Sequence, residues 1–134
     1  MPTIMTSCWY QYTGPGRVGV CQGAPRGVAA GYRMYKALAP SWDLIKTAES
    51  IDDYRPRYFR EVLDLLDPNR VLADVQKLAG GHTPVLMCFE KTPLTRTNFC
   101  HRTMVADWLG DKLGIQVGEW SGLKDLPLLN QVGA

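Results

Sequence analysis

The feature that most constrains the fold is an unbroken apolar run at residues 85–89, with the sequence VLMCF. Consecutive apolar residues without alternation are typical of a strand that is covered on both faces, as in a parallel sheet. Cys88 and Glu90 lie at the carboxyl end of this run. Because open parallel sheets bind ligands beyond the carboxyl ends of their strands, the run predicts the middle of a sheet and the position of a site.

Strand and helix patterns alternate on either side of this run. We expect further strands over about 4–12, 17–21 and 115–120, and helices from about Ser41, from Asp52 or Asp53 to about 66, over about 68–80, and from about Phe99 to about 113. Pro56 suits the first turn of the second of these helices. This order predicts a single-domain α/β chain with a Rossmann-like three-layer fold and a mainly parallel sheet. Residues 1–120 form the expected domain and residues 121–134 a peripheral tail.

Length and composition favour one compact domain. The chain has 134 residues, of which 46% are hydrophobic, and no run of 18 apolar residues occurs. The N-terminus lacks a basic flank followed by an apolar core, so the sequence predicts a cytoplasmic protein without a membrane span. We therefore expect all four cysteines to be reduced, although two disulfides are arithmetically allowed. They are Cys8, Cys21, Cys88 and Cys100.

Positive charge is concentrated in the first third of the chain. Residues 1–42 carry four basic residues and no acidic one, a charge of +4, whereas the whole chain carries +2. A local basic surface favours phosphate-bearing ligands or nucleic acid as partners. Scattered, solvated arginines explain the same pattern equally well.

Several motifs follow one another over roughly residues 4–120: GVCQGAP, ALAPSW, LLDP, MCFE and CHR. In this combination the chain resembles the bacterial domain of unknown function 488 family, in its short form. The resemblance implies a small α/β protein whose activity is unassigned. It also implies that the site consists of the residues in the MCFE and CHR motifs: Cys88, Glu90, Cys100, His101 and Arg102.

The chain departs from the family pattern at two places. Gln22 follows the second predicted strand where the family usually has a basic residue, and the loop over 91–99 is longer than usual. An anion site that relied on the missing basic residue would need Arg26 or Arg96 in its place.

The residue types at this turn suggest distinct roles. Cys100 at a helix start is a candidate nucleophile, because the helix dipole favours its thiolate; the alternative is a small buried hydrophobe. Cys88 fits a packed core residue better than a reactive one. Glu90 suits acid or base work, or else a salt bridge to Arg102. Arg102 suits a phosphate.

His101 and a metal are less clearly indicated. As the neighbour of Cys100, His101 does not share its helix face, so the sequence does not make it the base for that thiol. Zinc is a competing interpretation, with Cys88, Cys100 and His101 as ligands and Glu90 or Cys8 as the fourth. We do not favour it here, because adjacent ligands at Cys100 and His101 are awkward and no paired short-spacing motif occurs.

Two functional hypotheses remain from the sequence. The first is an enzyme or binder that acts on a phosphate-bearing ligand such as a nucleotide, with Gln22, Arg26 and Tyr35 as further ligand contacts and aromatic residues available for stacking on a base. The second is a noncatalytic interaction module for protein or nucleic acid, in which the Cys/Glu/His/Arg cluster is structural. Whether the protein is an enzyme is left open.

Overall fold

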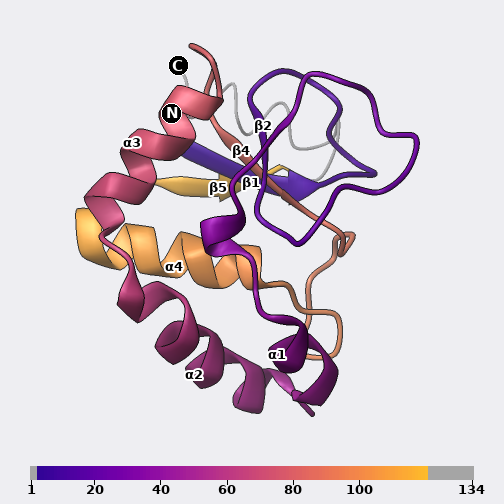
Figure 1. Ribbon diagram of the computed structural model, residues 1–134, viewed down its shortest axis with the longest axis vertical. Helices are drawn as coiled ribbons and strands as arrows, with labels where there is room; N and C mark the ends of the chain where they lie inside the picture. Colours follow the sequence, from indigo (N-terminus) through magenta and orange to yellow (C-terminus); the bar gives the residue numbers. More distant parts are fainter. Residues whose placement is uncertain (1–2, 121–134) are drawn as a thin grey trace.

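The computed structural model describes residues 3–120, which form one five-stranded, fully parallel sheet with helices against it (Figure 1). The order of the strands is β3-β2-β4-β1-β5. The strands are β1 (Ile4–Cys8), β2 (Arg17–Gly19), β3 (Arg33–Met34), β4 (Val85–Cys88) and β5 (Val117–Glu119). The predicted single-domain, Rossmann-like α/β fold is therefore confirmed.

Strand β4 lies in the middle of the sheet, between β1 and β2. Val85 is paired with Met5 on one side and with Arg17 on the other. All four residues of β4 are buried, as expected for an apolar run with no alternation. The carboxyl end of this strand is therefore enclosed by two neighbouring strands.

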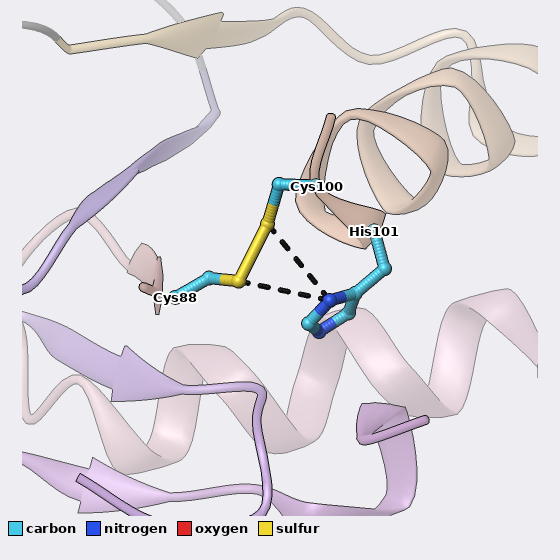
Figure 2. A group of neighbouring side chains, drawn as sticks. All are labelled: Cys88, Cys100 and His101. Carbon is cyan, nitrogen blue, oxygen red and sulfur yellow. Dashed lines mark hydrogen bonds between the residues drawn. A yellow bond between two sulfur atoms is a disulfide. The ribbon is translucent and has the colours of Figure 1, made fainter. Parts of the chain in front are cut away.

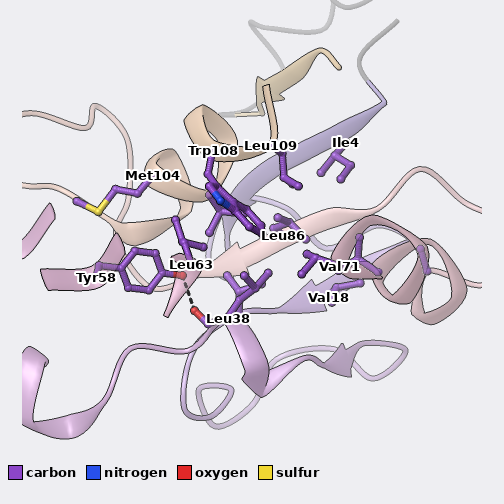
Figure 3. Packing of buried hydrophobic residues seen from close by; sticks show 14 of the residues in the cluster. Ile4, Val18, Leu38, Tyr58, Leu63, Val71, Leu86, Met104, Trp108 and Leu109 are labelled. Atoms are coloured by element: carbon purple, nitrogen blue, oxygen red, sulfur yellow. Dashed lines mark hydrogen bonds between the residues drawn. The ribbon is translucent and has the colours of Figure 1, made fainter. Parts of the chain in front are cut away.

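The helices cover one face of the sheet (Figure 1). They are α1 (Trp42–Thr47), α2 (Ile51–Glu61), α3 (Pro68–Leu78) and α4 (His101–Leu113), with 3-10 turns η1 (Lys36–Leu38) and η2 (Leu63–Leu65). The larger hydrophobic cluster fills the space between the helices and the strands (Figure 3). Helix α4 contributes Met104, Val105, Trp108 and Leu109 to this core.

Side chains fix where the helices begin. The Ser50 side chain accepts a hydrogen bond from the Asp53 amide, so α2 begins at Ile51, ahead of the predicted start. Pro56 consequently lies inside the helix, and the expectation that it occupies the first turn is wrong. The Asp67 side chain caps α3, which begins at Pro68 as predicted.

The other face of the sheet is covered by irregular segments rather than by helices. Trp9 and Tyr32 pack there, edge to face at 5.1 Å, over Met5, Val85 and Met87 of the strands. Figure 1 shows the long loops before β2 and between β2 and β3 on the side away from the helices. The third layer of the fold is therefore built from loops.

Arg17 holds this loop layer together. Its guanidinium is almost fully buried and donates hydrogen bonds to the carbonyl oxygens of Gly14, Ala29 and Ala30, at 2.9, 2.9 and 2.6 Å. Since these carbonyls belong to both loops, the charge of Arg17 is used inside the fold and does not contribute to a basic surface.

The expected C-terminal tail, residues 121–134, lies outside the described residues. Within residues 3–120, none of the helices has the length and apolarity that a membrane crossing requires.

Candidate functional site

A cavity of about 570 Å³ opens at the carboxyl ends of β2 and β4. This is the edge of the sheet that the sequence predicted. Residues that follow β2, residues that follow β4, helix α1 and the start of α4 all contribute to its wall. The lining residues are Cys21, Gln22, Gly23, Ala24, Pro40, Trp42, Ile45, Ala48, Tyr54, Cys88, Phe89, Glu90, Phe99, Cys100 and His101.

The wall of the cavity is mainly apolar and aromatic. Trp42, Tyr54, Phe89 and Phe99 supply four rings, and no lysine or arginine is among the described lining residues. Trp42 and Phe89 are exposed at 58% and 38%, so part of this aromatic surface faces solvent. Polar groups are confined to Gln22, Glu90, Tyr54 and the cysteine–histidine cluster.

Cys88 and Cys100 are joined by a disulfide in this cavity (Figure 2). The expectation that all four cysteines are reduced is therefore wrong for this pair, because the end of β4 and the start of α4 bring the two sulfurs together. Cys8 and Cys21 are free and buried. Cys88 is 2% exposed, as expected of a core residue, and it also contributes to the wall of the cavity.

His101 lies beside both sulfurs (Figure 2). Its Nε2 is 2.5 Å from the carbonyl oxygen of Val20, which can only accept a hydrogen bond, so Nε2 carries the proton. Nδ1 is then unprotonated and lies 3.6 Å from the sulfur of Cys88 and 3.9 Å from that of Cys100. The sequence did not predict that the Nδ1 lone pair of His101 faces both sulfurs.

Burial keeps the His101 ring neutral. The pKa of His101 falls to about 4, chiefly because burial penalises the charged ring and also because of the Arg102 charge, while the hydrogen bond to Val20 acts in the opposite direction. At neutral pH the ring is therefore an acceptor at Nδ1 and a donor at Nε2.

The backbone at the start of α4 explains how neighbouring residues reach one point. Cys100 is the N-cap of the helix and has extended dihedral angles, whereas His101 is the first helical residue. The sulfur of Cys100 accepts a hydrogen bond from the Arg102 amide, at 3.5 Å. Because the chain turns between Cys100 and His101, both side chains point towards Cys88, which sequence spacing alone had made awkward.

Glu90 stands at the edge of this cluster. Its Oε1 is 3.2 Å from the sulfur of Cys88, a hydrogen bond that forms only when Cys88 carries a thiol proton. The pKa of Tyr54, across the cavity, is raised by burial and further by the negative charge of Glu90. Glu90 is thus a carboxylate within contact distance of the Cys88 sulfur.

Arg102 points away from the cavity. Its buried guanidinium makes a two-point contact with Glu119 of β5, from Nε to Oε1 at 3.1 Å and from Nη2 to Oε2 at 3.0 Å. The alternative in which Glu90 forms a salt bridge with Arg102 is therefore wrong: β5 passes beside α4 and provides the carboxylate of Glu119. Arg102 is not among the residues that line the cavity.

Of the remaining residues predicted to contact a ligand, one lines the cavity and two do not. Gln22 lines the cavity, and its amide nitrogen donates to the Pro40 carbonyl at 2.8 Å. Arg26 is exposed, two residues beyond the lining residue Ala24. Tyr35 lies outside the lining and donates to Asp74 at 2.8 Å. The structure therefore brings Gln22, Glu90, Cys88, Cys100 and His101 together.

Other residues of the site were not identified from the sequence. Neither the Val20 carbonyl, which fixes the tautomer of His101, nor the ring of Phe99 was expected to contribute. Val20 and Cys21 follow β2 directly, so their place at the same sheet edge was the available signal. The aromatic residues Trp42 and Tyr54 also line the cavity.

The fold and site define a class: a Rossmann-like α/β domain with a cysteine–histidine centre in an aromatic cavity at the carboxyl edge of the sheet. Within that class the chain belongs to the DUF488-N3a family, described as the active DUF488-N3 subclade, whose model matches residues 6–113. The resemblance inferred from the sequence is confirmed. Neither a curated protein nor a solved structure matches the chain.

Proposed function

We propose that the protein is a small enzyme or binder for a nucleotide-like ligand, whose planar base enters the cavity above the sulfur–imidazole centre. The observation that carries the proposal is the convergence of Cys88, Cys100 and His101 at the inner end of a cavity at the sheet's carboxyl edge. Reactive groups that meet in a cavity at the carboxyl edge of a parallel sheet are the usual sign of a site.

The shape and chemistry of the cavity support a flat ligand. A volume of about 570 Å³ is in the range of small-molecule pockets. The rings of Trp42, Tyr54 and Phe99 offer surfaces on which a base can stack. The Gln22 amide offers a polar group at the wall, where it can read the edge of a base.

A phosphate group would lie at the rim of the cavity. Since no described lining residue carries a positive charge, the phosphate depends on exposed cations that are close in sequence to lining residues: Arg26, Lys46 and Lys91. In this proposal Arg26 takes the phosphate role that the sequence had also given to Arg102.

Glu90 and the cluster provide the chemical groups. Glu90 would move a proton at the inner wall, and Cys100, with His101 Nδ1 beside it, would act as nucleophile or positioning group once reduced. The description of the family as the active DUF488-N3 subclade supports this proposal. Within the described residues, the Arg102 guanidinium is engaged by Glu119 and has no part in this scheme.

The alternative is a noncatalytic interaction module. The exposed apolar side chains of Trp42, Ile45 and Phe89 at the cavity favour it, because such surface often marks a protein contact. In this view the disulfide is a structural bridge.

A thermal-shift titration with nucleosides and mononucleotides separates the two. We expect a ligand to raise the Tm of the wild-type protein, and we expect Glu90→Gln and Gln22→Leu to remove this rise with little change in the Tm of the free protein. Arg26→Ala should weaken binding of the mononucleotide more than binding of the nucleoside. Arg33→Ala, which replaces another exposed arginine, should change the binding of neither ligand. The proposal fails if neither ligand class shifts the Tm, or if Glu90→Gln and Gln22→Leu act only by destabilising the free protein.

A further inference from the structure

We propose that, once the disulfide is reduced, Cys88, Cys100 and His101 bind one soft divalent cation, best matched by Zn²⁺, at the inner end of the cavity. This inference rests on the proposed function and gives its sulfur–imidazole centre a chemical form. The three ligand atoms already lie within 4.8 Å of one another, and all three residues are buried. Two thiolates and an imidazole are ligand types that zinc takes in proteins.

The histidine is prepared for a metal. Its Nε2 proton is held by the Val20 carbonyl, so the Nδ1 lone pair is directed at the sulfurs before any ion arrives. A backbone carbonyl that accepts from the second ring nitrogen is a common outer-shell partner of metal-bound histidines, because it fixes the tautomer and the ring orientation.

The backbone leaves room for an ion between the sulfurs. The Cα atoms of Cys88 and Cys100 are 7.4 Å apart. This separation is wider than the usual Cα–Cα distance across a disulfide, which is about 4.4–6.8 Å. In a tetrahedral site with sulfurs about 2.3 Å from zinc, the two sulfurs are roughly 3.8 Å apart.

Charge balance also suits a buried cation here. Each thiol gives up its proton to solvent when it binds, so a divalent cation with two thiolates and a neutral imidazole has no net charge. The cavity wall is largely apolar and, among its described residues, carries no lysine or arginine that would repel a cation. A neutral cluster is the form that such a wall tolerates best.

The fourth coordination position would face the cavity and Glu90. Cys88, Cys100 and His101 leave one corner of a tetrahedron open, and Glu90 Oε1 lies 3.2 Å from the Cys88 sulfur. Three protein ligands with an open fourth position are typical of catalytic rather than structural zinc sites. Glu90 is therefore placed to meet whatever group occupies that corner.

Cobalt titration of the full chain tests the site. Protein reduced with a non-thiol phosphine and freed of metal should bind one Co²⁺ per chain. The complex should show a near-ultraviolet thiolate-to-cobalt band and the visible bands of a tetrahedral ion. Two protons should be released per ion, and Zn²⁺ should displace the cobalt. Zn²⁺ should also raise the Tm of the reduced protein and leave that of the oxidised protein unchanged.

Variants assign the ligands. Cys88→Ser and Cys100→Ser should lose the thiolate-to-cobalt band, and His101→Gln should weaken cobalt binding at least tenfold. Cys8→Ser, at a buried free cysteine outside the cavity, should keep the thiolate-to-cobalt band and the affinity for cobalt. If a variant of a metal-ligating residue fails to fold, the comparison of oxidised with reduced wild-type protein still tests the metal site, because it needs no substitution.

Three results would overturn the site: reduced wild-type protein without the thiolate band, equal binding by the oxidised protein, or a loss in Cys8→Ser as large as in Cys88→Ser. Failure here is distinguishable from failure of the proposed function. A nucleotide shift in a protein whose reduced form fails to bind cobalt would remove only the metal site. Metal binding without any shift by nucleosides or nucleotides would remove the nucleotide-like ligand and leave the metal site in place.

Discussion

Among residues 3–120, the fully buried guanidinium of Arg102 pairs with one carboxylate, that of Glu119. Glu119→Gln leaves the positive charge buried without its counter-charge, so we expect it to lower the free energy of unfolding by about 2 kcal/mol or more. Glu90→Gln should change it by less than about 0.5 kcal/mol. Urea unfolding measures both variants. Equal losses would mean that Glu90 shares the guanidinium after all.

Tyr58 gives the protein a pH limit on the alkaline side. Its hydroxyl donates to the Leu38 carbonyl at 2.6 Å, and burial raises its pKa well above 10. The unfolded chain loses this proton near pH 10, whereas the folded chain keeps it, so stability is present below about pH 10 and is lost as the pH rises further.

We therefore expect Tyr58→Phe to cost about 1–2 kcal/mol at neutral pH, where the hydrogen bond is lost, and to make the alkaline decline in stability shallower. Denaturant unfolding at pH values from 8 to about 11.5 measures both effects. Tyr10→Phe, at a side chain that is 54% exposed, is the matched control and should change neither. An unchanged alkaline slope in Tyr58→Phe would contradict this account of burial.

At the scale of elements, local signals predicted some boundaries and missed others. The predicted start of one helix at residue 68 and the predicted end of another at about residue 113 agree with α3 and α4. Strand β3 was read as a loop, because its two residues, Arg33 and Met34, carry no period and depend on pairing with β2. Whether such a short segment forms a strand depends on pairing with residues far away in the sequence.

Two glycines, one inside α4 and one at its C-cap, should respond in opposite ways to substitution by alanine. Gly114 has φ of 66°, which an alanine adopts at a cost of about 1 kcal/mol or more. Gly110 lies inside the helix, and a Cβ there would meet its nearest atom, the Ile115 oxygen, at an ordinary 3.6 Å. Gly110→Ala should therefore stabilise by about 0.8 kcal/mol. Thermal unfolding compares the pair, and a destabilising Gly110→Ala would show that the helix packs more tightly at that point than this contact indicates.

At the scale of the whole molecule, the sequence predicted which segments meet at the candidate site but not the contacts that their side chains make. The apolar run of β4 and the rule for parallel sheets were enough to predict the edge at which Cys88, Glu90 and the start of α4 meet. The contacts of Arg102 with Glu119 and of His101 with Val20 join segments that are 17 and 81 residues apart, and sequence spacing contains no signal for them. The cytoplasmic location likewise stays a prediction.

The disulfide links the end of the central strand β4 to the start of α4, so its reduction should lower the stability of the whole domain. It bridges residues 12 apart in sequence. Closing a loop of that size lowers the conformational entropy of the unfolded chain and so stabilises the folded state by about 3 kcal/mol. In the presence of a chelator, we expect a phosphine reductant to lower the unfolding free energy of the wild-type protein by about that amount. The double variant Cys88→Ala/Cys100→Ala should be insensitive to the reductant, and Cys8→Ser should respond like the wild type. Replacing the chelator with Zn²⁺ should restore part of the loss, because the ion ties the same two segments together. Equal stability of oxidised and reduced wild-type protein under chelation would contradict this prediction.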